Sequence, residues 1–158
     1  MPLRREPEIL IEKAARRLRL LAAGAPERCY PVKIGRNADA DKAVEGDCAT
    51  PLGEFTICAR NPRSRFFLSL CLSYPNAAHA ARGLRDALID AATHAAILAA
   101  LDAGRLPPQH TALGGEIYIH GEDPQGRDWT HGCIALGNRA MLEVYDRVRL
   151  GTRVRISS

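Results

Sequence analysis

The sequence has few aromatic residues and no dense run of positive charge. Aromatic residues make up 5% of the 158 residues, and the net charge of +4 comes from lysines and arginines scattered along the chain. Proteins that bind nucleic acid need a basic groove, and those that bind single strands also need stacking platforms. We therefore expect no nucleic-acid partner.

Long apolar runs are also missing. No stretch approaches the roughly 18 apolar residues of a transmembrane helix, so none is predicted. The N-terminal segment 1–26 is positively charged and contains leucines, but charged residues interrupt each apolar run. It thus lacks the apolar centre of a secretory signal. This predicts either a protein that stays inside the cell or an export segment outside this sequence.

The cysteines do not have the spacing of a metal or redox motif. There are five of them, an odd number, and no CxxC pair occurs. A zinc ribbon and a redox dithiol are therefore not expected. Free cysteines are commonly buried, which predicts that Cys58 and Cys71 fill core positions on strands.

The hydrophobic pattern predicts one mostly β domain over residues 1–158 with two helices. Short alternating or apolar runs predict strands over 8–13, 17–22, 28–34, 54–60, 66–74, 116–120, 129–136 and 152–157. The first three would form a meander, with Arg16, Arg17 and Arg19 on its solvent face. A long loop rich in Gly, Asp and Asn is predicted over 35–53.

Two segments have helical spacing. An Ala/Leu-rich segment predicts one long helix over about 84–103, ending before Gly104. We expect it to pack on the sheet, although it could also cap a cleft or bind a partner. A second helix is predicted to begin after Asn138, which would serve as its N-cap. The histidines on or near the first helix are expected to be exposed; they are His79, His94 and His110.

A cysteine and a histidine form the strongest candidate for a reactive site. A thiol nucleophile needs a base, a group that orients the base and donors for an oxyanion. His120 can act as the base of Cys133, and the carbonyl of Gly121 can orient its ring. The N–H groups of Gly132 and Cys133 can face an oxyanion. The residues alone leave open a structural cysteine and a zinc site with His131, which would lack a fourth ligand.

Two motifs resemble those of the L,D-transpeptidase catalytic domain family, often called YkuD-type. The first along the chain is Thr50-Pro51-Leu52-Gly53-Glu54-Phe55. The second is His120-Gly121, followed by Thr130-His131-Gly132-Cys133-Ile134 and Asn138. The resemblance covers nearly the whole chain apart from the Ala-rich helix. It implies a mostly β fold of the sandwich or open-barrel kind.

The resemblance implies a cysteine acyltransferase that acts on peptidoglycan stem peptides. The nucleophile would attack the carbonyl of the third, diamino-acid residue and expel a terminal D-amino acid, after which an amine would resolve the thioester. The implied catalytic residues are Cys133, His120 as base, Gly121 as backbone orienter and His131 as support. The implied oxyanion and substrate-binding residues are Gly132, Thr130, Trp129 and Tyr118.

The same resemblance implies a monomer without metal or cofactor, placed in the periplasm or cell envelope and acylated by carbapenems. Hydrolysis in place of transfer would make it an L,D-carboxypeptidase or an amidase. The chain could also be a non-catalytic peptidoglycan-binding module, or an intracellular thiol enzyme that acts on another peptide. Ala135 departs from the family pattern, because many members carry arginine two residues after the cysteine. The sequence therefore offers no arginine at that position for a substrate carboxylate.

Overall fold

The computed structural model describes residues 6–22 and 24–158. Residues 1–5 and 23, which belong to the N-terminal segment 1–26, lie outside the described residues. The strands are β1 (Glu8–Glu12), β2 (Arg17–Leu21), β3 (Arg28–Pro31), β4 (Gly53–Ser64), β5 (Phe67–Leu72), β6 (Tyr118–His120), β7 (Ile134–Ala135) and β8 (Arg153–Ser157). The helices are α1 (Ala77–Arg85), α2 (Ala91–Asp102) and α3 (Asn138–Arg147).

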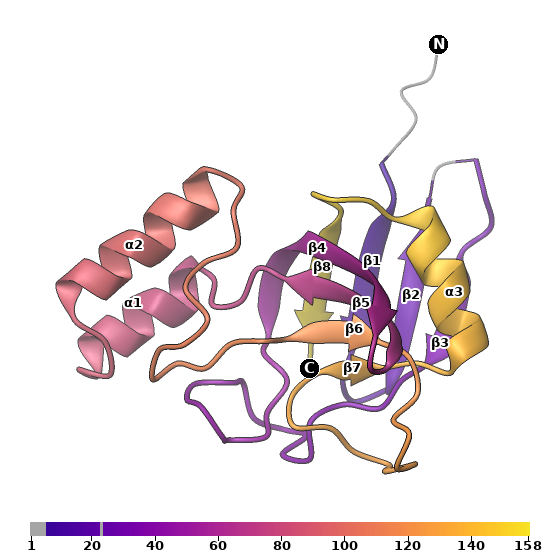
Figure 1. The fold of residues 1–158 in the computed structure, drawn as a ribbon, viewed down its shortest axis with the longest axis horizontal. Coiled ribbons are helices and arrows are strands. Elements are labelled where there is room, and N and C mark those ends of the chain that lie inside the picture. The colour runs from indigo at the N-terminus through magenta and orange to yellow at the C-terminus, as the bar shows by residue number, and fades with distance from the viewer. Residues whose placement is uncertain (1–5, 23) are drawn as a thin grey trace.

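The strands form one curled sheet of eight strands in the order β3-β2-β1-β8-β4-β5-β6-β7 (Figure 1). β1 runs parallel to β8 and β6 runs parallel to β7, while the other neighbours are antiparallel. The pairing of β4 with β5 is interrupted between Ile57 and Ala59 and again between Asn61 and Ser64. Such irregularities increase the local twist of a sheet. The prediction of a mostly β fold is confirmed.

The main core lies between the curled sheet and α3. Alternating residues of the N-terminal and C-terminal strands point inward, and Ile9, Ile11, Leu18, Leu20, Val154 and Ile156 are at most 2% exposed. Met141 and Val144 of α3 belong to the same cluster. Complete burial of one such side chain stabilises the fold by about 1.5–3 kcal/mol. The alternation of apolar and polar residues in these strands therefore supplies the side chains that fill this core.

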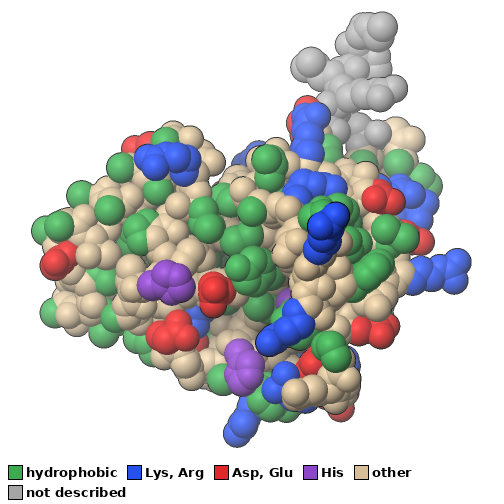
Figure 2. Space-filling view, viewed as in Figure 1, with side chains coloured by type: hydrophobic (Ala, Val, Ile, Leu, Met, Phe, Trp, Pro, Cys, Tyr) green, Lys and Arg blue, Asp and Glu red, His purple; other side chains and the backbone are tan. Residues whose placement is uncertain are grey.

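The N-terminal meander presents its arginines to solvent, as predicted. Arg17 and Arg19 pair with Glu12 at 3.0 and 3.4 Å, and Arg19 also pairs with Glu27. Exposed pairs of this kind contribute little to stability. On the face shown in Figure 2, Lys and Arg side chains are interspersed with acidic ones and form no continuous basic patch.

The Ala-rich segment forms two helices, so the prediction of one long helix over 84–103 is wrong. α1 ends at Arg85 with Asp86 as C-cap, Ala87 adopts a left-handed φ of 57°, and Asp90 caps α2 by accepting from the Thr93 N–H at 2.8 Å. An aspartate side chain at an N-cap accepts from backbone N–H groups of the first turn, so Asp90 begins a new helix. The described residues therefore form three helices where two were predicted.

The two Ala-rich helices pack on each other beside the sheet (Figure 1). They bury a small apolar cluster of their own, made by Ala80, Ile89, Ile97 and Leu113. No described helix is both long and apolar enough to span a membrane.

His79 is buried in α1, which corrects the prediction that it is exposed. Its Nε2 donates to Asp41 Oδ1 at 2.9 Å, and its Nδ1 lies 2.7 Å from Asn76 Oδ1. Arg82 donates to the other oxygen of Asp41 at 3.0 Å. These bonds fasten α1 to the loop 35–52. The spacing of apolar residues does not predict these bonds, because Asp41 is distant from α1 in the sequence.

Most predicted strands are shorter in the structure, and the reason is visible for β3 and β7. β3 ends at Pro31, and only isolated bridges, Lys33 with Ala135 and Gly35 with Thr130, continue the pairing beyond it. The predicted strand 129–136 is reduced to β7, since Gly132 has a φ of 139°. That backbone conformation favours glycine and interrupts an extended strand.

Candidate active site

The pairing of β6 with β7 places Cys133 and His120 on one face of the sheet. The strands are parallel, with His120 opposite Ala135 and Ile119 opposite Ile134. Cys133 directly precedes β7, two residues before Ala135, and therefore lies beside Tyr118. Side chains two residues apart in a strand share a face. The predicted nucleophile and base thus lie on the same face of adjacent strands and line one cavity.

His120 is held by the backbone of the residue that follows it. The ring is 4% exposed, and its Nδ1 donates to the Gly121 carbonyl oxygen at 2.7 Å. A carbonyl only accepts, so the proton sits on Nδ1 and leaves Nε2 as the basic nitrogen. Phe66 stacks on the imidazole with the ring centroids 4.3 Å apart. Burial lowers the pKa of His120, which favours the neutral imidazole.

Cys133 is a half-buried neutral thiol. Its Sγ accepts from the Tyr118 N–H at 3.4 Å and donates to the Glu116 carbonyl oxygen at 3.3 Å. Burial raises the pKa of Cys133 to about 11; the Glu116 carboxylate adds to that increase and the Tyr118 N–H opposes it. Both pKa shifts favour the uncharged forms, a neutral thiol and a neutral imidazole.

The segment before Cys133 is bent by the hydroxyl of Thr130. This hydroxyl donates to the Cys133 carbonyl oxygen at 2.6 Å and accepts from the Gly132 N–H at 3.0 Å. The Gly132 N–H is thus already engaged, although it was expected to face an oxyanion. Within the described residues, the Cys133 N–H donates no hydrogen bond. Of the two N–H groups, that of Cys133 is the one available to a substrate oxygen.

Thr50 fastens this segment to the loop 35–52. It is fully buried, and its hydroxyl accepts from the Gly35 N–H and donates to the Gly132 carbonyl oxygen, both at 2.8 Å. A Cβ at Gly132 would lie 2.8 Å from the Ala49 carbonyl oxygen, so the two segments touch through backbone. Sequence reasoning gave Thr50 no role, although it opens the Thr50–Phe55 motif.

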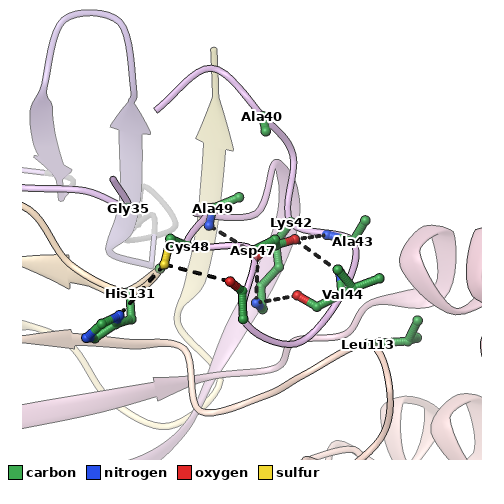
Figure 3. A network of polar contacts seen from close by, with 12 residues as sticks. Gly35, Ala40, Lys42, Ala43, Val44, Asp47, Cys48, Ala49, Leu113 and His131 are labelled. Atoms are coloured by element: carbon green, nitrogen blue, oxygen red, sulfur yellow. Dashed lines mark hydrogen bonds and ion pairs between the residues drawn. The ribbon is translucent and has the colours of Figure 1, made fainter. Parts of the chain in front are cut away.

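His131 contacts the same loop through Cys48 (Figure 3). The Cys48 Sγ lies 3.7 Å from His131 Nδ1, and the Trp129 ring meets the imidazole edge-on at 5.1 Å. Next to Cys48, Asp47 accepts from the buried Lys42 Nζ at 3.0 Å (Figure 3). The structure thus places His131 at the side of the site, in contact with the loop.

Asn138 is not the N-cap of its helix, which corrects the prediction. Gly137 is the N-cap, and α3 begins at Asn138. The Asn138 Oδ1 accepts from the Glu122 N–H at 2.9 Å, while the Glu122 carboxylate accepts from the Asn138 N–H at 3.2 Å. Asn138 therefore holds the turn that carries the Gly121 carbonyl.

A cavity of about 650 Å³ lies over these residues. Its lining includes the predicted site residues Tyr118, His120, Trp129, Thr130, His131 and Cys133, together with Glu116, Arg65, Phe66 and Cys71, which were not predicted. The expectation that Cys71 is buried on a strand is confirmed, whereas Cys58 is only half-buried. The two Ala-rich helices contribute nothing to the lining; Leu106, beyond α2, does.

The geometry favours thiol chemistry over metal binding. Within residues 6–22 and 24–158, no three His, Cys, Asp or Glu side chains converge to hold a metal ion. The zinc alternative therefore has no support from the arrangement of His120, His131 and Cys133. A neutral base with one free nitrogen, a thiol on the same face and a free N–H beside the thiol are the parts that acyl transfer needs.

A family model described as the L,D-transpeptidase catalytic domain, YkuD, matches residues 6–156. The chain belongs to this family. A comparison with curated protein sequences finds no match. The expected family is therefore confirmed over almost the whole chain.

Several solved structures share this fold. The helical cell shape determining protein Pgp2 from Campylobacter jejuni matches with a TM-score of 0.66 and 20% identity, over 98% of this chain and 49% of that one. Bd1075 from Bdellovibrio bacteriovorus matches with a TM-score of 0.61 and 20% identity, over 96% and 48%. An L,D-transpeptidase from Mycobacterium smegmatis matches at 0.57 and 16%, over 97% and 59%.

A further match is the LD transpeptidase LdtMt1 in complex with imipenem, with a TM-score of 0.53 and 12% identity, over 96% of this chain and 58% of that one. The L,D-transpeptidase domain described here spans about half the length of the first two of these structures.

Proposed function

We propose that this L,D-transpeptidase domain is a cysteine acyltransferase that acts on peptidoglycan stem peptides. The observation that carries the proposal is the buried His120, whose Nδ1 is fixed on the Gly121 carbonyl while Cys133 lies on the same sheet face inside the cavity. Cys133 would be the nucleophile and His120 the base. Because peptidoglycan lies in the cell envelope, we propose action in the periplasm or at the cell envelope, by a monomer.

The proposed reaction begins from the neutral pair. As the Cys133 sulfur bonds to the carbonyl carbon of the diamino-acid residue, its proton passes to His120 Nε2. The carbonyl oxygen becomes an oxyanion, which the Cys133 N–H stabilises by donating to it. The intermediate collapses as the carbon–nitrogen bond breaks, and His120 returns the proton to the departing amine. The products of this half-reaction are a thioester and a free D-amino acid.

The second half-reaction regenerates the thiol. An amine of another stem attacks the thioester carbonyl, and His120 takes a proton from that amine. The carbon–sulfur bond then breaks, and His120 gives this proton to the Cys133 sulfur, which leaves as the thiol. This route gives transpeptidation. With water in place of the amine the same steps give an L,D-carboxypeptidase, which we keep as the alternative.

The remaining residues of the site would support this reaction. Thr130 and His131 would position the segment before Cys133, and Trp129 and Tyr118 would line the substrate cavity.

Mass spectrometry of muropeptides incubated with the purified protein tests the proposal. We expect loss of a terminal D-amino acid or new cross-links, and the ratio of the two products decides between hydrolysis and transfer. Cys133→Ala should abolish both. Cys29→Ala, a change at an exposed thiol on β3, should leave both unchanged.

Imipenem provides a second measurement. The complex of LdtMt1 with imipenem supports the expectation that a carbapenem acylates Cys133. The intact protein should gain the mass of one drug molecule on the peptide that contains Cys133. If muropeptides stay unchanged and Cys133 is not acylated, the proposed enzyme function is wrong. A non-catalytic binding module would then remain, and it would bind muropeptides equally well with Cys133→Ala.

A further inference from the structure

The active-site cavity has two chemically different ends, which the strand pairing defines. Glu116 precedes β6, and its carbonyl accepts from the Cys133 thiol. At the opposite end of β6, the Gly121 N–H donates to the Phe66 carbonyl oxygen at 2.9 Å. From Glu116 to Gly121 the chain extends about 16 Å, at about 3.3 Å per residue. The cavity therefore runs along β6 from Glu116, past Cys133 and His120, to the turn between β4 and β5.

Arg65 is a cation at the His120 end of this cavity. It lies in the turn between β4 and β5, lines the cavity and is exposed. Its guanidinium carbon lies 4.9 Å from the centroid of the Phe66 ring, and Phe66 in turn stacks on His120. Among the described residues Arg65 has no acidic partner. The other arginine of the lining, Arg127, donates to Asp123 at 2.7 Å and is neutralised.

The position of Arg65 matches a group on the leaving residue. In the proposed reaction, which this inference assumes, His120 Nε2 returns a proton to the departing amine. In an α-amino acid the carboxyl carbon lies about 2.5 Å from the nitrogen, two bonds away. The carboxylate of a departing C-terminal residue is therefore held close to the His120 ring. Arg65 lies against the Phe66 ring that stacks on His120, and among the described arginines of the lining it is the one without an acidic partner.

We propose that Arg65 binds the free α-carboxylate of the leaving residue, so that the cavity selects peptides by their C-terminal carboxylate. A guanidinium suits this role because its planar fork donates two parallel hydrogen bonds to a carboxylate. The face of Phe66 orients the cation through a cation–π contact. Arg65 is thus a specificity-determining residue for the leaving group.

Glu116 at the other end reinforces this polarity. It is exposed, lines the cavity and has no cationic partner among the described residues. A carboxylate there repels an anionic peptide terminus, whereas it attracts an ammonium group such as the side-chain amine of a diamino acid. The charge pattern therefore orients a peptide with its C-terminal carboxylate toward Arg65.

A pair of synthetic stem tetrapeptides that end in D-alanine tests the inference, one as the free acid and one as the carboxamide. We expect the wild type to process the acid with a kcat/KM about 10- to 100-fold higher than the amide, the value of one charge-assisted bond. Arg65→Met should lower the rate for the acid to that for the amide, mainly by raising KM. Arg65→Lys should restore part of the preference, because it keeps the charge without the fork.

Arg63→Met is the matched control, since Arg63 lies on the same hairpin outside the cavity lining. It should keep the full preference for the acid. Binding of both peptides to Cys133→Ala and to Cys133→Ala with Arg65→Met, measured by calorimetry, gives a readout without turnover. The inference is wrong if the wild type does not distinguish acid from amide, or if Arg65→Met keeps the preference. Absence of turnover together with an Arg65-dependent preference in binding would contradict only the proposed reaction.

Discussion

The Nδ1 of His120 lies 2.7 Å from the carbonyl oxygen of Gly121, and the position of that carbonyl depends on the absence of a Gly121 side chain. A Cβ at Gly121 would lie 2.5 Å from both the Phe66 carbonyl oxygen and Asn138 Oδ1. The orientation of the proposed base therefore depends on close backbone packing at the next residue.

Gly121→Ala tests this dependence. The methyl group meets a backbone oxygen that cannot move freely, so we expect the Gly121 carbonyl to shift and the His120 ring to lose its fixed tautomer. Turnover of muropeptides should fall by at least about 10-fold, since misplacement of a catalytic group is costly. Gly137→Ala is the control. Its nearest atom, Glu122 Oε1, would lie 3.7 Å away, so the change should cost about 1 kcal/mol or less and keep activity. Equal activity of both variants would contradict the argument.

Thr50→Val should lower both the stability of the protein and the rate at which Cys133 is acylated. The substitution keeps the side-chain shape but leaves the buried Gly35 N–H and Gly132 carbonyl oxygen without their partner. Each unsatisfied buried group costs about 1–3 kcal/mol. Urea unfolding should show a lower midpoint, and single-turnover acylation by imipenem should be slower. Thr50→Ser keeps the hydroxyl and should recover most of both losses; failure of Ser to do so would show that the methyl group, rather than the hydroxyl, matters.

The loss of activity on acidification should have its midpoint below the ordinary pKa of histidine. Burial lowers the pKa of His120 below its ordinary value of about 6.5. The ring must be neutral to accept the thiol proton, so kcat/KM should fall as the pH drops through this lowered pKa and be on a plateau by pH 7. A profile of kcat/KM against pH measures the midpoint. A midpoint above 7 would contradict a buried neutral base.

The rate of alkylation of Cys133 should keep increasing with pH well into the alkaline range. Burial raises the pKa of the Cys133 thiol to about 11, and the thiolate is the reactive form. The rate of labelling by iodoacetamide, followed by mass spectrometry of the Cys133 peptide, should therefore still be rising at about pH 9, near the ordinary thiol value. A rate that is constant from pH 6 upward would instead indicate a thiolate–imidazolium pair in the resting protein.

Asp41 should stabilise the fold above its unfolded-state pKa. Burial raises the pKa of Asp41, but the hydrogen bonds from His79, Leu52 and Arg82 outweigh burial and hold it well below the usual range. Its contribution is complete above about pH 3.9 and is lost as the pH falls toward the lower folded-state pKa. Asp41→Asn should lower the free energy of unfolding by about 2–3 kcal/mol at pH 7, less than for a fully buried pair.

Denaturant titrations at pH 7, 5 and 3 measure this effect. The difference between wild type and Asp41→Asn should be equal at the first two values and smaller at the third. Asp39→Asn, a change at an exposed aspartate of the same loop without an ion pair among the described residues, should have little effect at any pH. A difference that grows as the pH falls would contradict the sign of the linkage.

Hydrophobic patterns in short stretches of the sequence predicted the strands whose two faces differ in burial. Alternation of apolar residues reports which strand face is buried, so the meander and the closing strand were predicted within a few residues. The break at Asp86–Asp90 was missed because alanine and leucine spacing continues through it, whereas the backbone N–H of Asp86 closes α1 and the side chain of Asp90 caps α2. The extent of β7 was missed because glycine conformation is not visible in a hydrophobic pattern.

The sequence by itself determined the family and pointed to the cysteine and histidine of the proposed site, because those residues lie in short ordered motifs. Only the tertiary structure decided what holds and surrounds them. Thr50 reaches Gly132 across 82 positions, and Asp41 reaches His79 across 38. Arg65 lies at the cavity because β5 pairs with β6, a contact with no local signature. Such pairings form through the curvature of the whole sheet, which no single stretch of residues specifies.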